Sequence, residues 1–183
     1  MKHLSDFFYS ASEGWIAFAA LLIFIFFSAL TLPGQSVLAE SYSQGSGSPD
    51  TLFFYSGSDL YTMAGLYGDM GRAAYVKARW TFDLAFPFVY TFFFVTALSW
   101  TLNKTLPSSS RWRLLNLVPI AAFLLDFLEN TMTTLVMSKY PFHYPPAELL
   151  ASIFTPLKWL MVGLSVFILL VGIVFLVKKI IQR

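Results

Sequence analysis

The stretch Asp126-Phe127-Leu128-Glu129-Asn130 decides how this chain is interpreted, because it places two carboxyls and an amide inside the apolar run 112–137. That run is long enough to cross the hydrocarbon core of a membrane as a helix. A charged side chain inside this core costs several kcal/mol unless it is paired, protonated or hydrated, so an intramembrane carboxyl is a candidate functional site. Asp126 lies 14 residues beyond Trp112. This is about 21 Å along a helix, past the middle of a core about 30 Å thick.

The overall composition indicates a membrane protein with one domain. Hydrophobic residues make up 57% of the 183 residues, which is more than soluble chains contain. The chain has no cysteine, which excludes disulfides and thiolate chemistry. A formal net charge of +2 with scattered basic residues argues against a nucleic-acid partner. We therefore predict an all-α integral membrane protein.

Four apolar runs are long enough to be transmembrane helices, and we predict that they pack as a four-helix bundle. They cover residues 15–32, 80–102, 112–137 and 149–177. Pro33-Gly34 is expected to end the first helix. A cleaved signal peptide is the alternative for this run, since Val37-Leu38-Ala39 ends in a small residue. The acidic residues Asp6 and Glu13 before the run, and its length, argue against cleavage.

The polar segment 34–78 between the first two spans contains helix signals. Ser58 or Asp59 is expected to cap a short amphipathic helix, and Gly68 to end it. Asp69 then caps a second helix that starts near Met70 and continues into the second span. We interpret the segment as a short helical lid on the extracytoplasmic side of the bundle, with a plain tethered loop as the alternative. Its apolar part, residues 51–55, is expected to contact the membrane or the bundle.

Polar residues fall on the inward faces of three spans at similar depths. In the second span, Asp83 and Tyr90 share one helix face, and Arg79 lies one turn earlier. Small and polar residues, the Asp126 stretch among them, form one stripe of the third span. The fourth span carries Lys158 in its first third. The predicted binding site consists of Arg72, Arg79, Asp83, Tyr90, Asp126, Glu129, Asn130 and Lys158.

The predicted site has more negative than positive charge. Three carboxyls face Lys158 and Arg79, so simple pairing leaves about one carboxylate unmatched unless Arg72 reaches down from the lid. Protonation, a bound cation or water would each relieve this excess. The sequence leaves open whether a metal ion binds there, and no cofactor is predicted.

Basic residues predict the orientation in the membrane. The positive-inside rule places loops rich in Lys and Arg on the cytoplasmic side. Here the middle linker and the end of the chain are basic, whereas the two other loops are neutral or slightly acidic. Both termini should therefore be cytoplasmic, with the lid and the Asp126 stretch toward the outside. The residues that carry this prediction are Lys104, Arg111, Arg113, Lys178, Lys179 and Arg183.

A likeness to a known family covers most of residues 50–160 and rests on five short motifs. They are Gly71-Arg72-x-x-Tyr75, Asp83-x-x-Phe86-Pro87-x-x-Tyr90, Arg113-Leu114-x-Asn116-x-x-Pro119, Asp126-x-x-Glu129-Asn130 and Lys158-Trp159. As a set they resemble a family of small four-span bacterial inner-membrane proteins that has no established activity. The resemblance implies a location in the bacterial inner membrane and a first span that is retained, and it transfers no activity.

Three hypotheses for the function, from different classes, remain open. A binding protein or small transporter would hold an ion, a proton or a lipid headgroup in the polar pocket. A purely structural cluster would hydrogen-bond across helices in a membrane scaffold or partner protein. A lipid-modifying enzyme would use two carboxyls as acid and base or as ligands of Mg²⁺ or Ca²⁺. The enzyme is the least favoured, because no Ser-His-carboxylate set is evident. The predicted partners are membrane lipids and a small ligand or cation, and an oligomer is left open.

Overall fold

The chain folds into helices throughout. The computed structural model describes residues 1–182, which form eight helical segments and no strand. Four helical stretches are long and apolar enough to cross a membrane: Gly14–Ser43, Gly57–Thr105, Arg111–Lys139 and Pro145–Ile181. The prediction of an all-α chain with four such stretches is confirmed.

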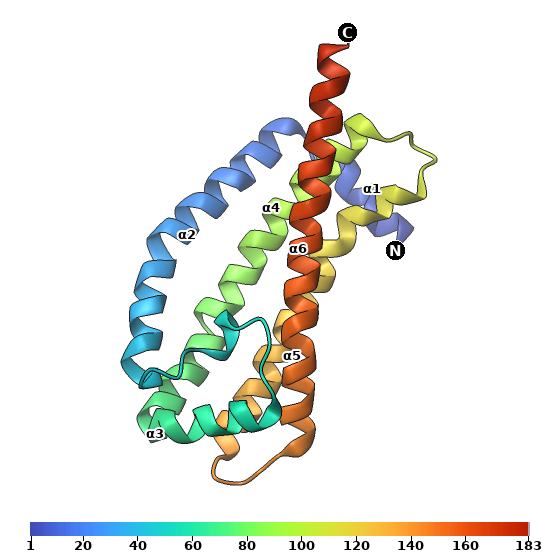
Figure 1. Ribbon diagram of the computed structural model, residues 1–183. Coiled ribbons are helices and arrows are strands. Elements are labelled where there is room, and N and C mark those ends of the chain that lie inside the picture. The colour runs from blue at the N-terminus through green and yellow to red at the C-terminus, as the bar shows by residue number, and fades with distance from the viewer. Residues whose placement is uncertain (183) are drawn as a thin grey trace.

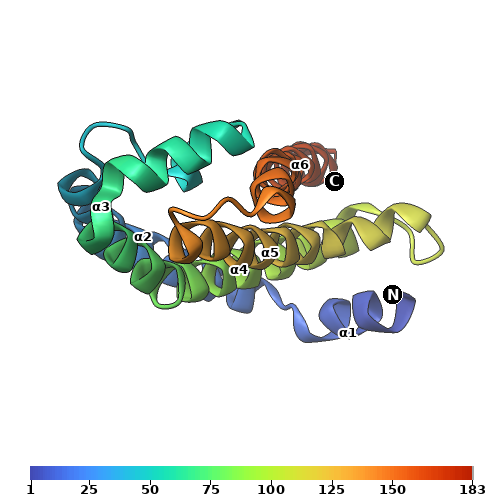
Figure 2. The same ribbon diagram turned by 90° about the horizontal axis from the view of Figure 1, so that it is seen from below.

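Four long helices run along the molecule (Figure 1). They are α2 (Gly14–Ser43), α4 (Phe82–Thr105), α5 (Val118–Lys139) and α6 (Pro145–Ile181). α5 packs against α4 and α6, while α2 packs against α4 and leans away from α6. α3 (Gly57–Arg79) lies across one end of the bundle, and both chain termini lie toward the other end (Figure 1, Figure 2).

The outward faces of α2 and α6 are apolar. Phe26 on α2 and Phe167 on α6 are each 63% exposed, and many other large aliphatic side chains of these helices are exposed with them. A continuous apolar surface of this kind is unfavourable in water and suits a lipid environment. The exposed surface and the helix lengths therefore both indicate a membrane environment.

The first spanning helix is longer than the sequence suggested. α2 continues through Pro33 and ends at Ser43, so the prediction that Pro33-Gly34 ends it is wrong. Proline removes only one backbone hydrogen bond. A long helix tolerates this loss when its neighbouring backbone groups are hydrogen-bonded. The helix ends where Gln44 and Gly45 adopt left-handed conformations, with φ of 50° and 81°.

α3 begins with a capping box, which accounts for its start. Ser56 Oγ accepts a hydrogen bond from the Asp59 amide (3.2 Å), and the Asp59 carboxylate accepts one from the Ser56 amide (2.9 Å). The cap predicted at Ser58 or Asp59 is therefore wrong, because Asp59 is the partner of the cap and not the cap itself.

α3 consists of two parts. Gly68 has φ 62° and ψ 178° and interrupts the helix where the sequence predicted a break. The second part ends at Arg79, and a turn at Trp80 and Thr81 separates it from α4. The prediction that this helix continues into the second span is therefore wrong, since the backbone changes direction between the two helices.

An aromatic core lies between α3 and the bundle. It includes Val136 and Met137 of α5, Ala151 of α6, Leu60 of α3 and four tyrosines from α2, α3 and the segment between them. The tyrosines are Tyr42, Tyr55, Tyr67 and Tyr75. The segment 51–55 contacts the bundle through Tyr55, as predicted, whereas Phe53 and Phe54 are exposed.

A short helix precedes the first span and has no counterpart in the sequence prediction. α1 (Lys2–Ala11) lies against α4 and the 3₁₀ helix η2 (Arg111–Leu117), which leads into α5. Ser5 Oγ donates to Asn116 Oδ1 (2.8 Å), and Tyr9 donates to the carbonyl oxygen of Arg113 (2.7 Å). Burial raises the pKa of Tyr9 to about 12, so its hydroxyl stays a donor. These contacts fix α1 to the bundle.

The break in α3 predicts that Gly68→Ala lowers the free energy of unfolding by about 1–3 kcal/mol, because φ near +60° with ψ near 180° is open only to glycine. No atom lies within 4 Å of the added Cβ, so the cost is one of backbone strain alone. Thermal unfolding in detergent measures the effect. Gly163→Ala is the matched control, since Gly163 lies in regular helix with equally open surroundings. Equal melting temperatures for the two variants would contradict the assigned backbone at Gly68.

Candidate functional site

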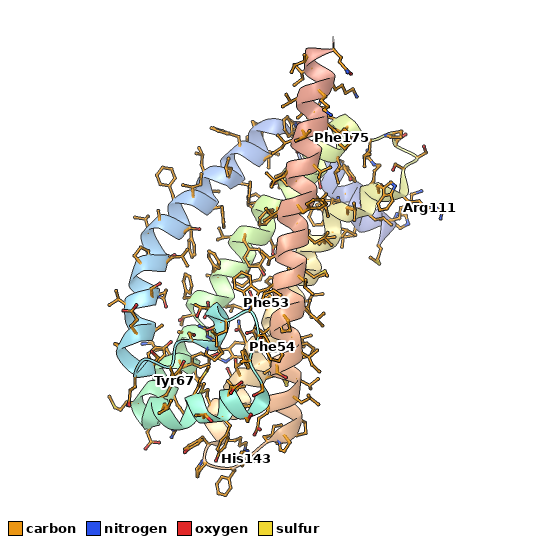
Figure 3. All side chains as sticks on the ribbon, in the orientation of Figure 1. Phe53, Phe54, Tyr67, Arg111, His143 and Phe175 are labelled. Atoms are coloured by element: carbon orange, nitrogen blue, oxygen red, sulfur yellow. The ribbon has the colours of Figure 1, made fainter. Side chains whose placement is uncertain are left out.

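Two basic side chains are buried between the bundle and α3, and each contacts two carboxylates. Arg79 at the end of α3 is 6% exposed, and Lys158 on α6 is 5% exposed. Figure 3 labels Tyr67 and His143 at this end of the molecule and Arg111 at the other. We call the two basic residues and their four carboxylate partners the acidic cluster: Arg79, Lys158, Asp50, Asp83, Asp126 and Glu129.

Arg79 joins the connection between α2 and α3 to the start of α4. Its guanidinium forms ion pairs with Asp50, in the 3₁₀ helix η1 (Pro49–Thr51), and with Asp83 on α4. It also lies over the ring of Tyr75, 4.6 Å from the centroid. Asp50 is held further by Ser48 Oγ, which donates to it at 2.7 Å. A segment remote in sequence is thereby fixed to the bundle.

Lys158 joins α6 to α5. Its Nζ lies 2.5 Å from Glu129 Oε2 and 3.5 Å from Asp126 Oδ1. Tyr90 on α4 donates to Asp126 Oδ2 at 3.3 Å. The stripe of the third span that contains the Asp126 stretch therefore faces inward, with Glu129 wholly buried.

Two further contacts connect the halves of the cluster. Asn130 Nδ2 donates to the backbone oxygen of Asp83 at 3.1 Å. The hydroxyls of Tyr55 and Thr155 lie 2.9 Å apart, one turn before Lys158 on α6. Burial raises the pKa of Tyr55 well above its usual value, and the nearby Glu129 charge adds to the effect, so this hydroxyl stays neutral.

One member of the cluster was not predicted from the sequence, and one predicted residue lies outside it. Asp50 lies in a Ser/Gly-rich stretch without helical periodicity, so no pattern linked it to Arg79. Arg72 does not reach the cluster: its guanidinium donates to the Ala64 carbonyl oxygen, pairs with Asp69 and lies over the Tyr140 ring. The seven other predicted residues are brought together.

The acidic cluster has a formal charge of −2, because four carboxylates face two cations. Its unsatisfied atoms include acceptors on the Asp126 stretch: Glu129 Oε1 and Asn130 Oδ1 have no hydrogen-bond partner among the described residues. Glu129 Oε2 has only its ion contact with Lys158. A buried acceptor without a donor costs about 1–3 kcal/mol. Asp83 Oδ2 has only its ion contact with Arg79, and Arg79 Nε is the one unpaired donor among the described atoms of the cluster. Unpaired acceptors therefore outnumber unpaired donors, and the site lacks positive charge.

Access to the cluster is graded. The side chains of Asp50 and Asp83 are each 15% exposed, that of Asp126 is 12% exposed, and that of Glu129 is not exposed at all. Within residues 1–182, no group of three or more His, Asp or Glu side chains converges as a preformed metal site would. The arrangement suits small positive charges that enter from the side of α3.

The fold and the site together define a class: an all-helical protein with four helices of membrane-spanning length and an acidic, donor-poor cluster buried among them. No protein-family model, no curated protein and no solved structure matches this chain. Membership of the four-span bacterial family therefore stays a prediction.

Removal of the cation between Asp126 and Glu129 tests the pairing. We expect Lys158→Met to lower the free energy of unfolding by about 3–5 kcal/mol, because it leaves buried carboxylates without a counter-charge. Thermal unfolding in detergent at neutral pH is the measurement. Addition of Glu129→Gln to this variant should restore part of the loss. Lys139→Met, at an exposed lysine on α5, should change stability by less than about 0.5 kcal/mol. Equal melting temperatures for Lys158→Met and the wild type would contradict the pairing.

Proposed function

We propose that this protein is a multi-pass membrane protein that binds protons in the acidic cluster. The hypothesis of a binding protein or small transporter left an ion, a proton or a lipid headgroup as the ligand, and the proposal selects the proton. The observation that carries the proposal is the surplus of two buried carboxylates together with the unpaired acceptor oxygens of Glu129 and Asn130. A proton supplies both missing items at once, a positive charge and a hydrogen-bond donor.

The chemistry of the cluster favours the proton over the other candidate ligands. The phosphate of a lipid headgroup would be repelled by the net negative charge. A divalent metal ion requires several converging oxygen ligands, and the described residues hold no such group. A hydrolytic or transfer enzyme would need a nucleophile or activated water beside the carboxyls, and His143 pairs with Glu148 outside the cluster.

A comparison within the molecule argues against a purely structural cluster. Asn116, which fixes α1, is wholly buried, and both polar atoms of its side chain are used: Oδ1 accepts from Ser5, and Nδ2 donates to Ser99 Oγ at 3.0 Å. A polar group that serves only packing is expected to be satisfied in this way. Glu129 and Asn130 are also deeply buried, but each keeps an oxygen without a partner among the described residues: Glu129 Oε1 and Asn130 Oδ1.

In this proposal α3 and residues 44–56 act as the lid over the site. Asp83, whose side chain is 15% exposed, receives the proton from the aqueous side, and the wholly buried Glu129 is the inner acceptor. Arg79 pairs both with Asp83 and with Asp50 of the lid. A proton on Asp83 therefore changes the ion pair that holds the lid. The protein lies in the bacterial inner membrane with both termini in the cytoplasm and the lid outside.

The dependence of stability on pH tests proton binding. Unfolded carboxyls take up protons only near pH 4. Protons that bind only to the folded cluster between about pH 8 and about pH 5 therefore stabilise the protein as the pH falls. When the proton concentration is a hundred times the dissociation constant of the site, proton binding adds about 2.7 kcal/mol to the free energy of unfolding. The melting temperature in detergent should rise over this range in the wild type.

The control variants and added salts distinguish a bound proton from a bound metal cation. Glu129→Gln should abolish the rise, whereas Glu40→Gln, at an exposed carboxyl of α2, should retain it. Addition of NaCl or CaCl₂ at about pH 8 should not reproduce the rise. A rise with salt would show a metal cation instead, and a melting temperature independent of both pH and salt would favour the structural hypothesis.

The orientation is tested separately. Single cysteines are introduced as Ser46→Cys, between α2 and α3, and Ser109→Cys, between α4 and α5, in a chain without natural cysteine. An impermeant thiol reagent added to intact cells should label the first and spare the second, because basic loops stay in the cytoplasm. Labelling of Ser109→Cys alone would place the cluster toward the cytoplasm.

A further inference from the structure

A groove with apolar walls opens at the end of the molecule opposite to α3. Its volume is about 490 Å³, within the range of about 300–1,000 Å³ that small-molecule sites occupy. α1 forms one wall, and α4 and α5 form the others. The walls include Phe7 and Ala11 of α1, Phe92 and Val95 of α4, and Ile120 and Phe123 of α5.

The wall formed by α1 is a fixed part of the fold. Ser5 and Tyr9 point from this helix to η2 and are buried there, hydrogen-bonded to Asn116 and to the backbone of Arg113. The apolar face of α1, with Phe7 61% exposed, is left facing the groove and its surroundings. An amphipathic helix with one face bound to protein and the other apolar belongs at the boundary between headgroups and acyl chains.

A second, polar cavity adjoins the groove at the turn between α1 and α2. It measures about 320 Å³, and Trp100, Asn103 and Lys104 of α4 line it. Ser12 lines both cavities. The residue is 5% exposed, and its Oγ has no hydrogen-bond partner in the described part of the chain. One hydroxyl is therefore left unpaired at the junction of an apolar space and a polar one.

This end of the molecule is also basic. Lys2 on α1, Lys104, Arg111, Arg113, Lys178 and Lys179 lie there, with Asp6 and Glu13 as the acidic residues. Basic side chains next to membrane-spanning helices attract anionic lipids. Glu13 and Lys104 both line the polar cavity and balance each other's charge. The preference for a negatively charged headgroup therefore comes from the excess of basic residues around the cavity.

We propose that the two cavities together bind one anionic phospholipid. An acyl chain lies in the apolar groove, an ester carbonyl accepts a hydrogen bond from Ser12, and the phosphate headgroup lies by Asn103 and Lys104. Along the lipid, the acyl chain, the ester and the headgroup follow one another in the same order as the apolar groove, Ser12 and the polar cavity along the protein. The proposal is independent of proton binding, because the acidic cluster lies at the other end of the bundle.

Native mass spectrometry tests this site with a defined lipid mixture. The full chain is incubated in detergent with equal amounts of dioleoyl phosphatidylglycerol and dioleoyl phosphatidylcholine, and the adducts are counted. The wild type should carry one phosphatidylglycerol in excess over phosphatidylcholine. Ala11→Trp, which fills the groove from an exposed position, should lose this adduct. Leu4→Trp, on the same helix but outside the groove, should keep it.

Two milder variants test the polar contacts without a change of volume in the groove. Lys104→Gln should lower the adduct about fivefold, the effect of one basic residue, while Arg111→Gln, at the same end but outside both cavities, should not. Ser12→Ala should also lower it about fivefold by loss of one hydrogen bond, and should not lower the melting temperature, since the hydroxyl is unpaired in the free protein.

The outcomes decide the proposal. If Ala11→Trp does not fold, Ser12→Ala and Lys104→Gln decide alone. Equal adducts in the wild type and all variants would show unspecific lipid at the protein surface and overturn the proposal. Equal amounts of bound phosphatidylcholine and phosphatidylglycerol in the wild type would overturn it as well.

Discussion

The buried guanidinium of Arg79 is the interaction on which the α3 end of the structure depends. It pairs with Asp50 before α3 and with Asp83 at the start of α4, and so connects three segments through one side chain. Removal of either carboxylate would leave a cation that is 6% exposed with half of its counter-charge. The aromatic core around Tyr55, Tyr67 and Tyr75 closes over this contact. Residues 44–56 therefore take part in the bundle, although their composition is that of a flexible linker.

The two ends of the bundle use buried polar groups in opposite ways. Around Asn116 donors and acceptors match, charge is absent, and the result is a fixed attachment of α1. Around Glu129 acceptors outnumber donors and carboxylates outnumber cations. Buried unpaired groups cost free energy, and departures from full pairing are expected mainly at functional sites. The contrast within one chain makes the acidic cluster the stronger functional candidate.

Much of the fold was predictable from the sequence, because apolar run length and helical periodicity act locally. The four spans, the break at Gly68 and the convergence of Asp83, Asp126, Glu129 and Lys158 follow from such patterns. The remainder depends on tertiary contacts that no local pattern carries. Asp50 meets Arg79 only because the chain folds back after α2, Arg72 finds nearer partners in Asp69 and Tyr140, and α2 passes through Pro33 because its other backbone bonds compensate.

The shared position of Arg79 links the charge of α4 to the contact that holds residues 44–56. As long as Asp50 and Asp83 are both charged, the guanidinium divides its attraction between the lid segment and α4. If Asp83 binds the proposed proton, Asp50 is left as the stronger partner of Arg79, because a neutral carboxyl attracts the guanidinium less than a carboxylate does. Arg79 thus couples the charge at the start of α4 to the contact that holds residues 44–56.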